Sequence, residues 1–187
     1  TGRSPLEALS IGVDMKASDV SFRCNLVTLS EEDCAYEERT ILDHSSDEIT
    51  TEEAAVLIEA LKAGLKEKGY SFYVGTSYRH LLIQEKGAVL ELVPPHDILT
   101  KKIGDYLPKD AALLSMMKES YNILNNHPVN ADRRERGLRP ANSAWFWGAG
   151  KKPSLDSFEK RTGKKGVMIS AVDLPKGIAV GVGMDSV

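Results

Sequence analysis

The chain has 187 residues, a formal net charge of −3, 42% hydrophobic and 27% charged residues, a composition typical of a globular protein able to bury a core. The net negative charge argues against a general nucleic-acid-binding protein, so no nucleic-acid partner is expected. No apolar run approaches the roughly 18 residues of a membrane-spanning helix, so no membrane partner is expected either.

Acidic and basic residues are unevenly distributed along the chain. Residues 31–59 hold eleven acidic residues against the single base Arg39, whereas residues 132–165 hold ten basic residues against four acidic ones. This asymmetry indicates a site for a small anion, although two solvated faces of opposite sign explain it equally well. Cys24 and Cys34 lack metal-ligand spacing and are expected to be reduced thiols in a cytoplasmic protein.

The first predicted elements are a strand and a helix. After a turn-rich entry with a short helical stretch, Val20–Leu29 is rich in strand-forming residues. Its alternation places Arg23 and Asn25 on one face, where they need polar partners or an exposed edge. An acidic connector follows. Thr50 and Glu53 then have the spacing of a capping box, and the apolar residues of 54–65 predict an amphipathic helix ending at Gly69.

The following segments alternate between strands, helices and turns. We predict a short strand at 71–74, a hairpin of 78–83 with 88–93, and a helix that begins at Pro108. Ser154 is expected to cap a short helix, followed by a buried strand at 166–170 and a helical turn at 173–179. These elements predict an α+β (mixed α/β) fold, with helices packed on a mixed or antiparallel sheet.

The segment from His127 to Pro153 combines many functional residue types. It holds four arginines, two lysines, three prolines and both tryptophans of the chain. The prolines predict an ordered loop rather than a helix, and the cations indicate an anion site. Trp145 and Trp147 are expected to pack in the core or against this loop.

Common catalytic motifs do not occur in the sequence. There is no nucleophile elbow, no phosphate-binding loop and no dinucleotide fingerprint. The four histidines, at 44, 80, 96 and 127, have no metal-binding spacing, and His96 with Asp97 would supply only two of the ligands that a metal site needs. A hydrolase triad, a phosphate-binding loop and a complete metal site are therefore not predicted within this chain.

Several cationic and polar side chains lie in or near predicted strand ends and turns, where a rigid scaffold usually presents binding groups. A structural role explains each of them singly as well as binding does, but their number favours an anion site. The candidate substrate-binding residues are Arg3, Arg23, Arg79, His80, His96, Arg139 and Asn142.

The same residues belong to short motifs that occur in a characteristic order. The motifs are Thr1-Gly-Arg-Ser-Pro-Leu-Glu-Ala8, Phe22-Arg-Cys-Asn25, Tyr78-Arg-His80, Pro94-Pro-His-Asp97, His127-Pro-Val-Asn130, Arg139-Pro-Ala-Asn142 and Trp145-Phe-Trp-Gly-Ala-Gly150. Over nearly its whole length, the chain therefore closely resembles the archaeal-type cofactor-independent (2,3-bisphosphoglycerate-independent) phosphoglycerate mutases of the alkaline phosphatase superfamily.

This resemblance implies a two-domain parent enzyme. One domain is phosphatase-like, with a serine nucleophile and two divalent metal ions (Mn, Mg, Co or Zn), and the other is inserted into it. Residues 1–187 would be the inserted substrate-binding domain, with border segments 1–19 and 171–187 leading to the missing phosphatase-like domain, its expected partner. The isolated chain, which lacks the nucleophile and the metal ligands, is expected to be inactive and to bind no metal.

The implied reaction interconverts 3-phosphoglycerate and 2-phosphoglycerate through a phosphoserine in the missing domain. The seven candidate residues would help to bind and reorient this small phosphorylated substrate. Two departures from the family pattern leave other functions open: Ser4 replaces a usual glycine, and Tyr36-Glu-Glu-Arg39 diverges from the usual form, which is richer in arginine. The alternatives are a related phosphotransferase, labelled homoserine kinase-like or phosphonopyruvate decarboxylase-like, and a non-catalytic binding module.

Overall fold

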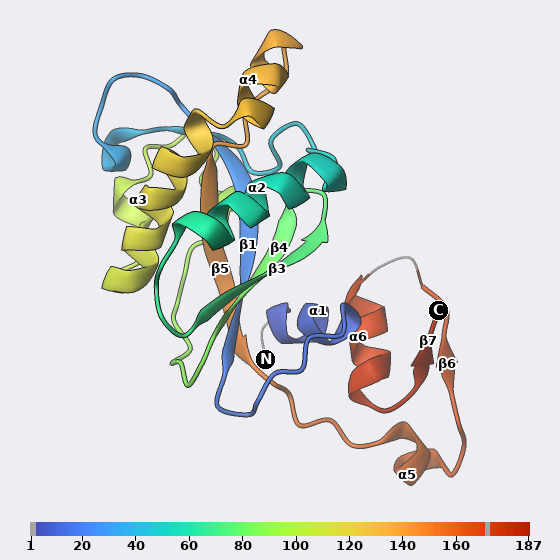
Figure 1. Ribbon diagram of the computed structural model, residues 1–187. Coiled ribbons are helices and arrows are strands. Elements are labelled where there is room, and N and C mark those ends of the chain that lie inside the picture. Colours follow the sequence, from blue (N-terminus) through green and yellow to red (C-terminus); the bar gives the residue numbers. More distant parts are fainter. Residues whose placement is uncertain (1–2, 171–172) are drawn as a thin grey trace. The chain divides into compact units, whose positions relative to one another are not determined.

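The computed structural model describes residues 3–170 and 173–187 (Figure 1). The first two residues of the opening motif and the first two of the expected border segment 171–187 lie outside the described residues. The chain divides into two compact units. The terminal unit comprises Thr1–Phe22, Ile83–Leu90 and Gly148–Val187, and the central unit comprises Arg23–Leu82 and Glu91–Trp147. The single inserted domain stays a prediction.

A five-stranded antiparallel sheet is the scaffold formed by the described residues. The strands β2 (Ile41–Asp43), β1 (Val20–Leu29), β4 (Arg79–Gln84) and β3 (Tyr70–Thr76) follow one another in this order, and β5 (Ser143–Lys151) also pairs with β1. The α+β prediction is confirmed. β1 is buried along its whole length, so the exposed edge considered for Arg23 and Asn25 is wrong, because strands flank β1 on both sides.

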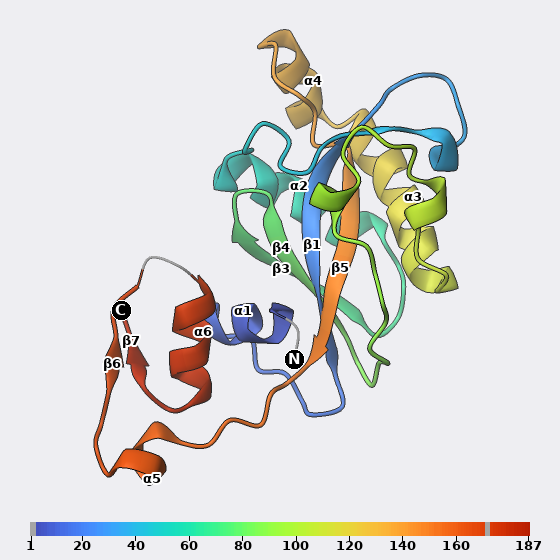
Figure 2. The same ribbon diagram turned by 180° about the vertical axis from the view of Figure 1, so that it is seen from behind.

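Two helices cover one face of this sheet in the central unit. Figure 1 shows α2 (Thr51–Gly64) and α3 (Ala111–Asn125) in front of the strands, and Figure 2 shows, on the opposite face, the segment with the 3-10 turns η2 (Pro95–Asp97) and η3 (Gly104–Tyr106). The connector between β1 and β2 contains a third such turn, η1 (Tyr36–Glu38). The core therefore lies between the sheet and the two helices.

The helix termini follow from their capping side chains. The hydroxyl of Thr50 accepts a hydrogen bond from the backbone N–H of Glu53 at 3.2 Å, as the capping box predicts. α2 ends at Gly64 rather than Gly69, because Leu65 is already extended. α3 begins at Ala111 rather than Pro108, because Asp110 caps it by accepting from the N–H of Leu113 at 2.9 Å.

The hairpin predicted between residues 78–83 and 88–93 does not form; a different hairpin forms instead. β3 pairs with β4 across Ser77 and Tyr78, and residues 88–93 form no strand. The predicted partner is wrong because β1 and β3 already occupy both edges of β4. Glycine is required at Gly75, where a Cβ would collide with the carbonyl oxygen of Arg79.

The segment from His127 to Pro153 is not a loop. It contains helix α4 (Pro128–Glu135), the strand β5 and a short connection between them. Pro128 occupies the first turn of the helix, where its missing N–H costs nothing and its fixed φ is favourable. The loop prediction is therefore wrong, because a proline in the first turn of a helix does not break it.

The terminal unit contains short elements. α1 (Ser4–Ser10) packs against α6 (Asp173–Gly181), and β6 (Val167–Met168) pairs in parallel with β7 (Asp185–Ser186). Ser157 rather than Ser154 caps α5 (Phe158–Thr162). The strand predicted as buried is short and exposed, with Ile169 at 83% exposure just after it. No helix of the described residues is long and apolar enough to cross a bilayer.

The serine that departs from the family pattern has a structural role in this unit. Ser4 is fully buried, and its hydroxyl oxygen lies 3.0 Å from the carbonyl oxygen of Ser21 and 2.7 Å from that of Gly148. It also accepts a hydrogen bond from the hydroxyl of Ser21 at 2.9 Å. A buried hydroxyl at residue 4 is thus fully partnered, as burial requires.

The packing of α2 on the sheet predicts the effect of truncating its buried face. Leu57 is fully buried, whereas its neighbour Val56 is 50% exposed. We expect Leu57→Ala to lower the free energy of unfolding by about 2–5 kcal/mol, and Val56→Ala to change it by only about 0.5 kcal/mol. Urea denaturation followed by circular dichroism measures both. Equal effects of the two substitutions would contradict this packing.

Candidate functional site

The interior strand β1 carries polar side chains that meet the end of β5. The guanidinium carbon of Arg23 lies 4.4 Å from the ring centroid of Trp147, a cation–π arrangement. The indole N–H of Trp147 donates to the side-chain oxygen of Asn25 at 3.0 Å. The polar face predicted for β1 is thus partnered by the indole of Trp147.

Two histidines extend this contact. The imidazole of His96, on η2, packs edge-on against Trp147 with centroids 5.2 Å apart. The ring of His44, which follows β2, lies 6.2 Å from that of His96 and 5.7 Å from that of Tyr78. The carbonyl oxygen of His44 accepts a hydrogen bond from the amide of Asn25 at 3.1 Å.

Arg79 completes the group at the β3–β4 turn. Its guanidinium carbon lies 5.5 Å from the ring centroid of Tyr78, and among the described residues no carboxylate forms an ion pair with it. We call the group the basic–aromatic cluster. Its members are Arg23, Asn25, His44, Tyr78, Arg79, His96 and Trp147. Arginine and imidazole groups beside aromatic faces can bind a small anion that bears a carboxylate or phosphoryl group.

Arg139 lies beside this cluster and is paired. Its guanidinium is 3.4 Å from the carboxylate of Asp43 and 4.0 Å from that of Asp47. Burial of Asp43 disfavours its ionised form, but hydrogen bonds from the backbone of Asp47 and Ser45 outweigh burial and hold the pKa of Asp43 below its usual value. The Nδ1 atom of His44 is 3.9 Å from the same carboxylate.

The residues just after His44 form a strained turn. Ser46, Asp47 and Glu48 have φ values of 51°, 53° and 50°, a left-handed conformation that costs about 1–2 kcal/mol for each residue with a side chain. Such conformations persist only where surrounding contacts over-determine them. The backbone N–H of Asp47 donates to Asp43 at 2.7 Å, and the hydroxyl of Ser46 donates to the carbonyl oxygen of Leu26 at 3.1 Å.

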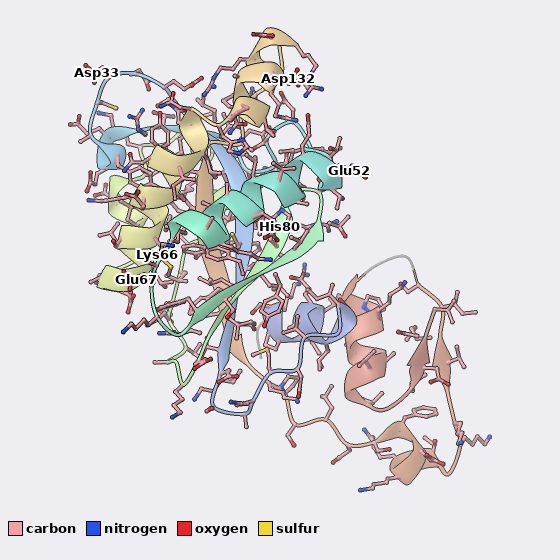
Figure 3. All side chains as sticks on the ribbon, in the orientation of Figure 1. Asp33, Glu52, Lys66, Glu67, His80 and Asp132 are labelled. Carbon is pink, nitrogen blue, oxygen red and sulfur yellow. The ribbon has the colours of Figure 1, made fainter. Side chains whose placement is uncertain are left out.

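A buried arginine from α4 also holds this turn. Arg133 is 1% exposed and donates to the carbonyl oxygens of Ser46, at 2.6 Å, and Arg139, at 3.0 Å. Its guanidinium also pairs with the carboxylate of Glu53 at 2.6 Å. Figure 3 labels Asp132 and Glu52, the neighbours of Arg133 and Glu53 on α4 and α2. In the sequence, Arg133 was only one of the four arginines of the segment from His127 to Pro153, and it was not among the candidate substrate-binding residues.

Two predicted residues lie inside the fold. His80 on β4 is 2% exposed (Figure 3), and its Nδ1 accepts the backbone N–H of Gly75 at 3.1 Å. Asn142 is fully buried, accepting the N–H of Leu29 at 2.8 Å and donating to its carbonyl oxygen at 3.0 Å. Both side chains are engaged with the backbone of the sheet.

Arg3 belongs to the terminal unit, whereas the other six predicted residues belong to the central unit. It is exposed and caps α1, where its carbonyl oxygen accepts the N–H groups of Leu6 and Glu7 at 3.1 Å each. The structure thus brings together Arg23, Arg79 and His96, with Arg139 adjacent.

The described residues provide no cluster of metal ligands. They contain no group of three or more histidine, cysteine, aspartate or glutamate side chains that could hold a metal ion. Cys24 and Cys34 are both free thiols. The metal ions that the family resemblance implies therefore do not fit the side chains described in this chain.

Several members of the basic–aromatic cluster were missed as candidates. The strand alternation had put Asn25 on the face of Arg23, and Tyr78 stands beside Arg79, so both could have been included. Trp147 was assigned to packing because an aromatic residue near a strand usually packs. His44 carried no signal, since only the chain's return after β2 brings it near His96.

The fold and the cluster define a class: an α+β domain with a cationic and aromatic site suited to a small anion. A sequence model of the 2,3-bisphosphoglycerate-independent phosphoglycerate mutase family matches residues 1–130. A 2,3-bisphosphoglycerate-independent phosphoglycerate mutase of Methanosarcina barkeri is 50% identical over 190 residues, covering 99% of this chain and 46% of that protein. The chain belongs to this family, in its archaeal type.

Solved structures agree with this assignment. A Pyrococcus horikoshii protein, 23% identical, superposes with a TM-score of 0.69 over all of this chain and 42% of its own, and shows the fold alone. A cofactor-independent phosphoglycerate mutase of Thermoplasma acidophilum, 26% identical, has a TM-score of 0.61 over all of this chain and 51% of its own. The chain thus spans about half the length of the relatives it matches.

The buried His80 predicts a specific pH dependence of stability. Burial lowers its pKa from 6.5 to about 4, so between these pH values the unfolded chain binds a proton at His80 that the folded chain does not. Stability therefore falls as the pH falls from 6.5 to 4, by about 3 kcal/mol in total. Urea denaturation at a series of pH values measures this loss.

The matched control is His80→Asn, whose side-chain oxygen can still accept from Gly75 but does not titrate. The variant should lose less stability than the parent chain across the same pH interval. The carboxyl groups with lowered pKa, such as Asp43 and Glu53, lose their contribution as the pH falls below the ordinary values of 3.8 and 4.5, and they do so in both proteins. Equal pH dependence in both proteins would contradict the role assigned to His80.

Proposed function

We propose that this chain is the substrate-binding part of a metal-dependent phosphoglycerate mutase that interconverts 3-phosphoglycerate and 2-phosphoglycerate. Its family membership supports the reaction, and the basic–aromatic cluster is the observation that carries the binding role. The proposed substrate bears a carboxylate and a phosphoryl group, and each of these anions suits a guanidinium. The proposed location is the cytoplasm, where the free thiols of Cys24 and Cys34 stay reduced.

The members of the cluster would bind and orient the substrate. Arg23 is held by Trp147 and Arg79 by Tyr78, so both guanidinium groups are directed before the ligand arrives, which reduces the entropy cost of binding. His96 would donate a hydrogen bond to a glycerate oxygen. Cations placed in this way stabilise the charge that spreads over a phosphoryl group during transfer.

The remaining four predicted residues have proposed roles that differ from one another. Arg139 would contribute charge at the rim of the cluster, next to Asp43. Asn142 and His80 would act through the sheet backbone they hold, which keeps β1 and β4 in register. Arg3, from the terminal unit, stays a predicted substrate ligand.

The serine nucleophile and the metal ions would be supplied by another domain of the same protein, and the chain by itself would be inactive. Relatives about twice as long as this chain support a further domain. So does the β6–β7 pair, because parallel strands are usually covered on both faces, whereas Val167 is 57% exposed and Ile169 83%. In this proposal, segments 1–19 and 171–187 lead to that domain.

If the basic–aromatic cluster binds the substrate, replacing one of its arginines should weaken catalysis by the whole protein. Arg79→Gln should lower kcat/KM for 3-phosphoglycerate by about tenfold to a hundredfold, the effect of losing a charged hydrogen bond. The matched control is Lys66→Gln, which should leave kcat/KM unchanged. Lys66 is exposed and lies just after the C-terminal end of α2, in the connection to β3 (Figure 3). Steady-state assays with Mn²⁺ measure both variants.

Two results would contradict the proposal. One is an Arg79→Gln protein as active as the Lys66→Gln control, which would remove Arg79 from the substrate site. The other is a whole protein with no mutase turnover that phosphorylates homoserine with ATP, which would favour the related phosphotransferase.

If a further domain covers the β6–β7 pair, substituting the exposed Ile169 should destabilise the whole protein. In the whole protein, Ile169→Ser should lower the free energy of unfolding by about 1.5–3 kcal/mol, because a covered isoleucine would lose its burial. Val56→Ser, on the outer face of α2, should change it by only about 0.5 kcal/mol. Thermal denaturation measures the difference. Equal small effects would mean that Ile169 faces solvent in the whole protein as well.

A further inference from the structure

The turn after His44 links a buried arginine to the basic–aromatic cluster. Its residues Ser46, Asp47 and Glu48 are all left-handed, although none is glycine, so the backbone does not favour this conformation by itself. A turn of this kind adopts another conformation when the contacts that enforce it are removed. Whatever holds the turn therefore also affects His44, which lies two residues before it.

Arg133 is the contact that reaches this turn from a distant helix. Its planar guanidinium uses three different nitrogen atoms, for the carbonyl oxygen of Ser46, the carboxylate of Glu53 and the carbonyl oxygen of Arg139. A lysine ammonium cannot reproduce this planar set of directions. The guanidinium thus joins α4, the first turn of α2 and the strained turn in one geometry.

His44 is fixed from both sides by the same arrangement. Its carbonyl oxygen accepts from Asn25, and its neighbour Asp43 binds the backbone N–H groups of Ser45 and Asp47 at 2.8 Å and 2.7 Å. The imidazole is about one-third exposed and stands between the rings of Tyr78 and His96. A ring so placed can reach an anion bound by the cluster.

We propose that His44 is a further substrate-binding residue and that Arg133 is its positioning residue, acting through the turn of Ser46, Asp47 and Glu48. The inference rests on the proposed function for the identity of its ligand, the carboxylate or phosphoryl group of phosphoglycerate. His44 donates a hydrogen bond to that group. Arg133 never touches the substrate, and its effect is to keep the imidazole beside His96.

The binding role of His44 is tested by kinetics of the whole protein. His44→Gln should raise KM for 3-phosphoglycerate about tenfold, the effect of losing a hydrogen bond to a charged group, while kcat changes less than KM. The control is His127→Asn, which keeps the acceptor that caps α4 and should leave KM unchanged. A His44→Gln protein with the KM of the control overturns this role.

The positioning role is tested by histidine imidazole signals in nuclear magnetic resonance spectra of the whole protein. The His44→Gln spectrum identifies the signal of His44. Arg133→Lys should shift or broaden this signal and raise KM, whereas adding Glu48→Gly should restore both, because glycine adopts the left-handed conformation without strain. Glu48 suits this rescue because its side chain is exposed.

Each outcome of these tests is decisive. An unchanged His44 signal in Arg133→Lys overturns the positioning role, and so does a double variant that does not fold, which would make Arg133 a residue of global stability. A wild-type protein without mutase turnover contradicts the proposed function instead. In that case the signal of His44 still reports whether Arg133 holds it.

Discussion

The buried guanidinium of Arg133 is the interaction on which the candidate site depends most. It binds the strained turn after His44, the first turn of α2 through Glu53, and the segment that leads to β5 through Arg139. Removing one partner of a buried charge costs about 3–5 kcal/mol, because the other charge is left without compensation. The three segments, far apart in the sequence, therefore keep one geometry relative to one another.

The basic–aromatic cluster follows from that geometry and from the interior position of β1. A strand with neighbours on both sides is rigid, and here its face carries Arg23 and Asn25 toward Trp147 and the histidines. Aromatic rings orient the guanidinium groups of Arg23 and Arg79, and the rings do not themselves neutralise the positive charges. This arrangement suits a small substrate that bears a carboxylate and a phosphoryl group, and it supports the proposed binding role.

Local rules predicted those parts of the fold that depend on local contacts. The alternating strand at Val20–Leu29, the cap formed by Thr50 with Glu53 and the apolar face of α2 were all confirmed. The two main errors had different causes. Residues 88–93 cannot pair with β4 because β1 and β3 occupy both of its edges, which a distant part of the chain decides. The error at Pro128 was local, because a proline is favourable in the first turn of a helix.

The sequence by itself determined the family, the α+β class and a set of cationic residues suited to an anionic substrate, since motif order and periodicity are local properties. Only the tertiary structure decided how these residues are used. Arg23, Arg79 and His96 meet at one cluster, His80 and Asn142 bind the backbone inside the sheet, and Arg133 is a buried anchor. The physical reason is that a polar side chain takes its role from its partner, and the partner can be as far as 122 residues away in the sequence, as for Trp147 and Asn25.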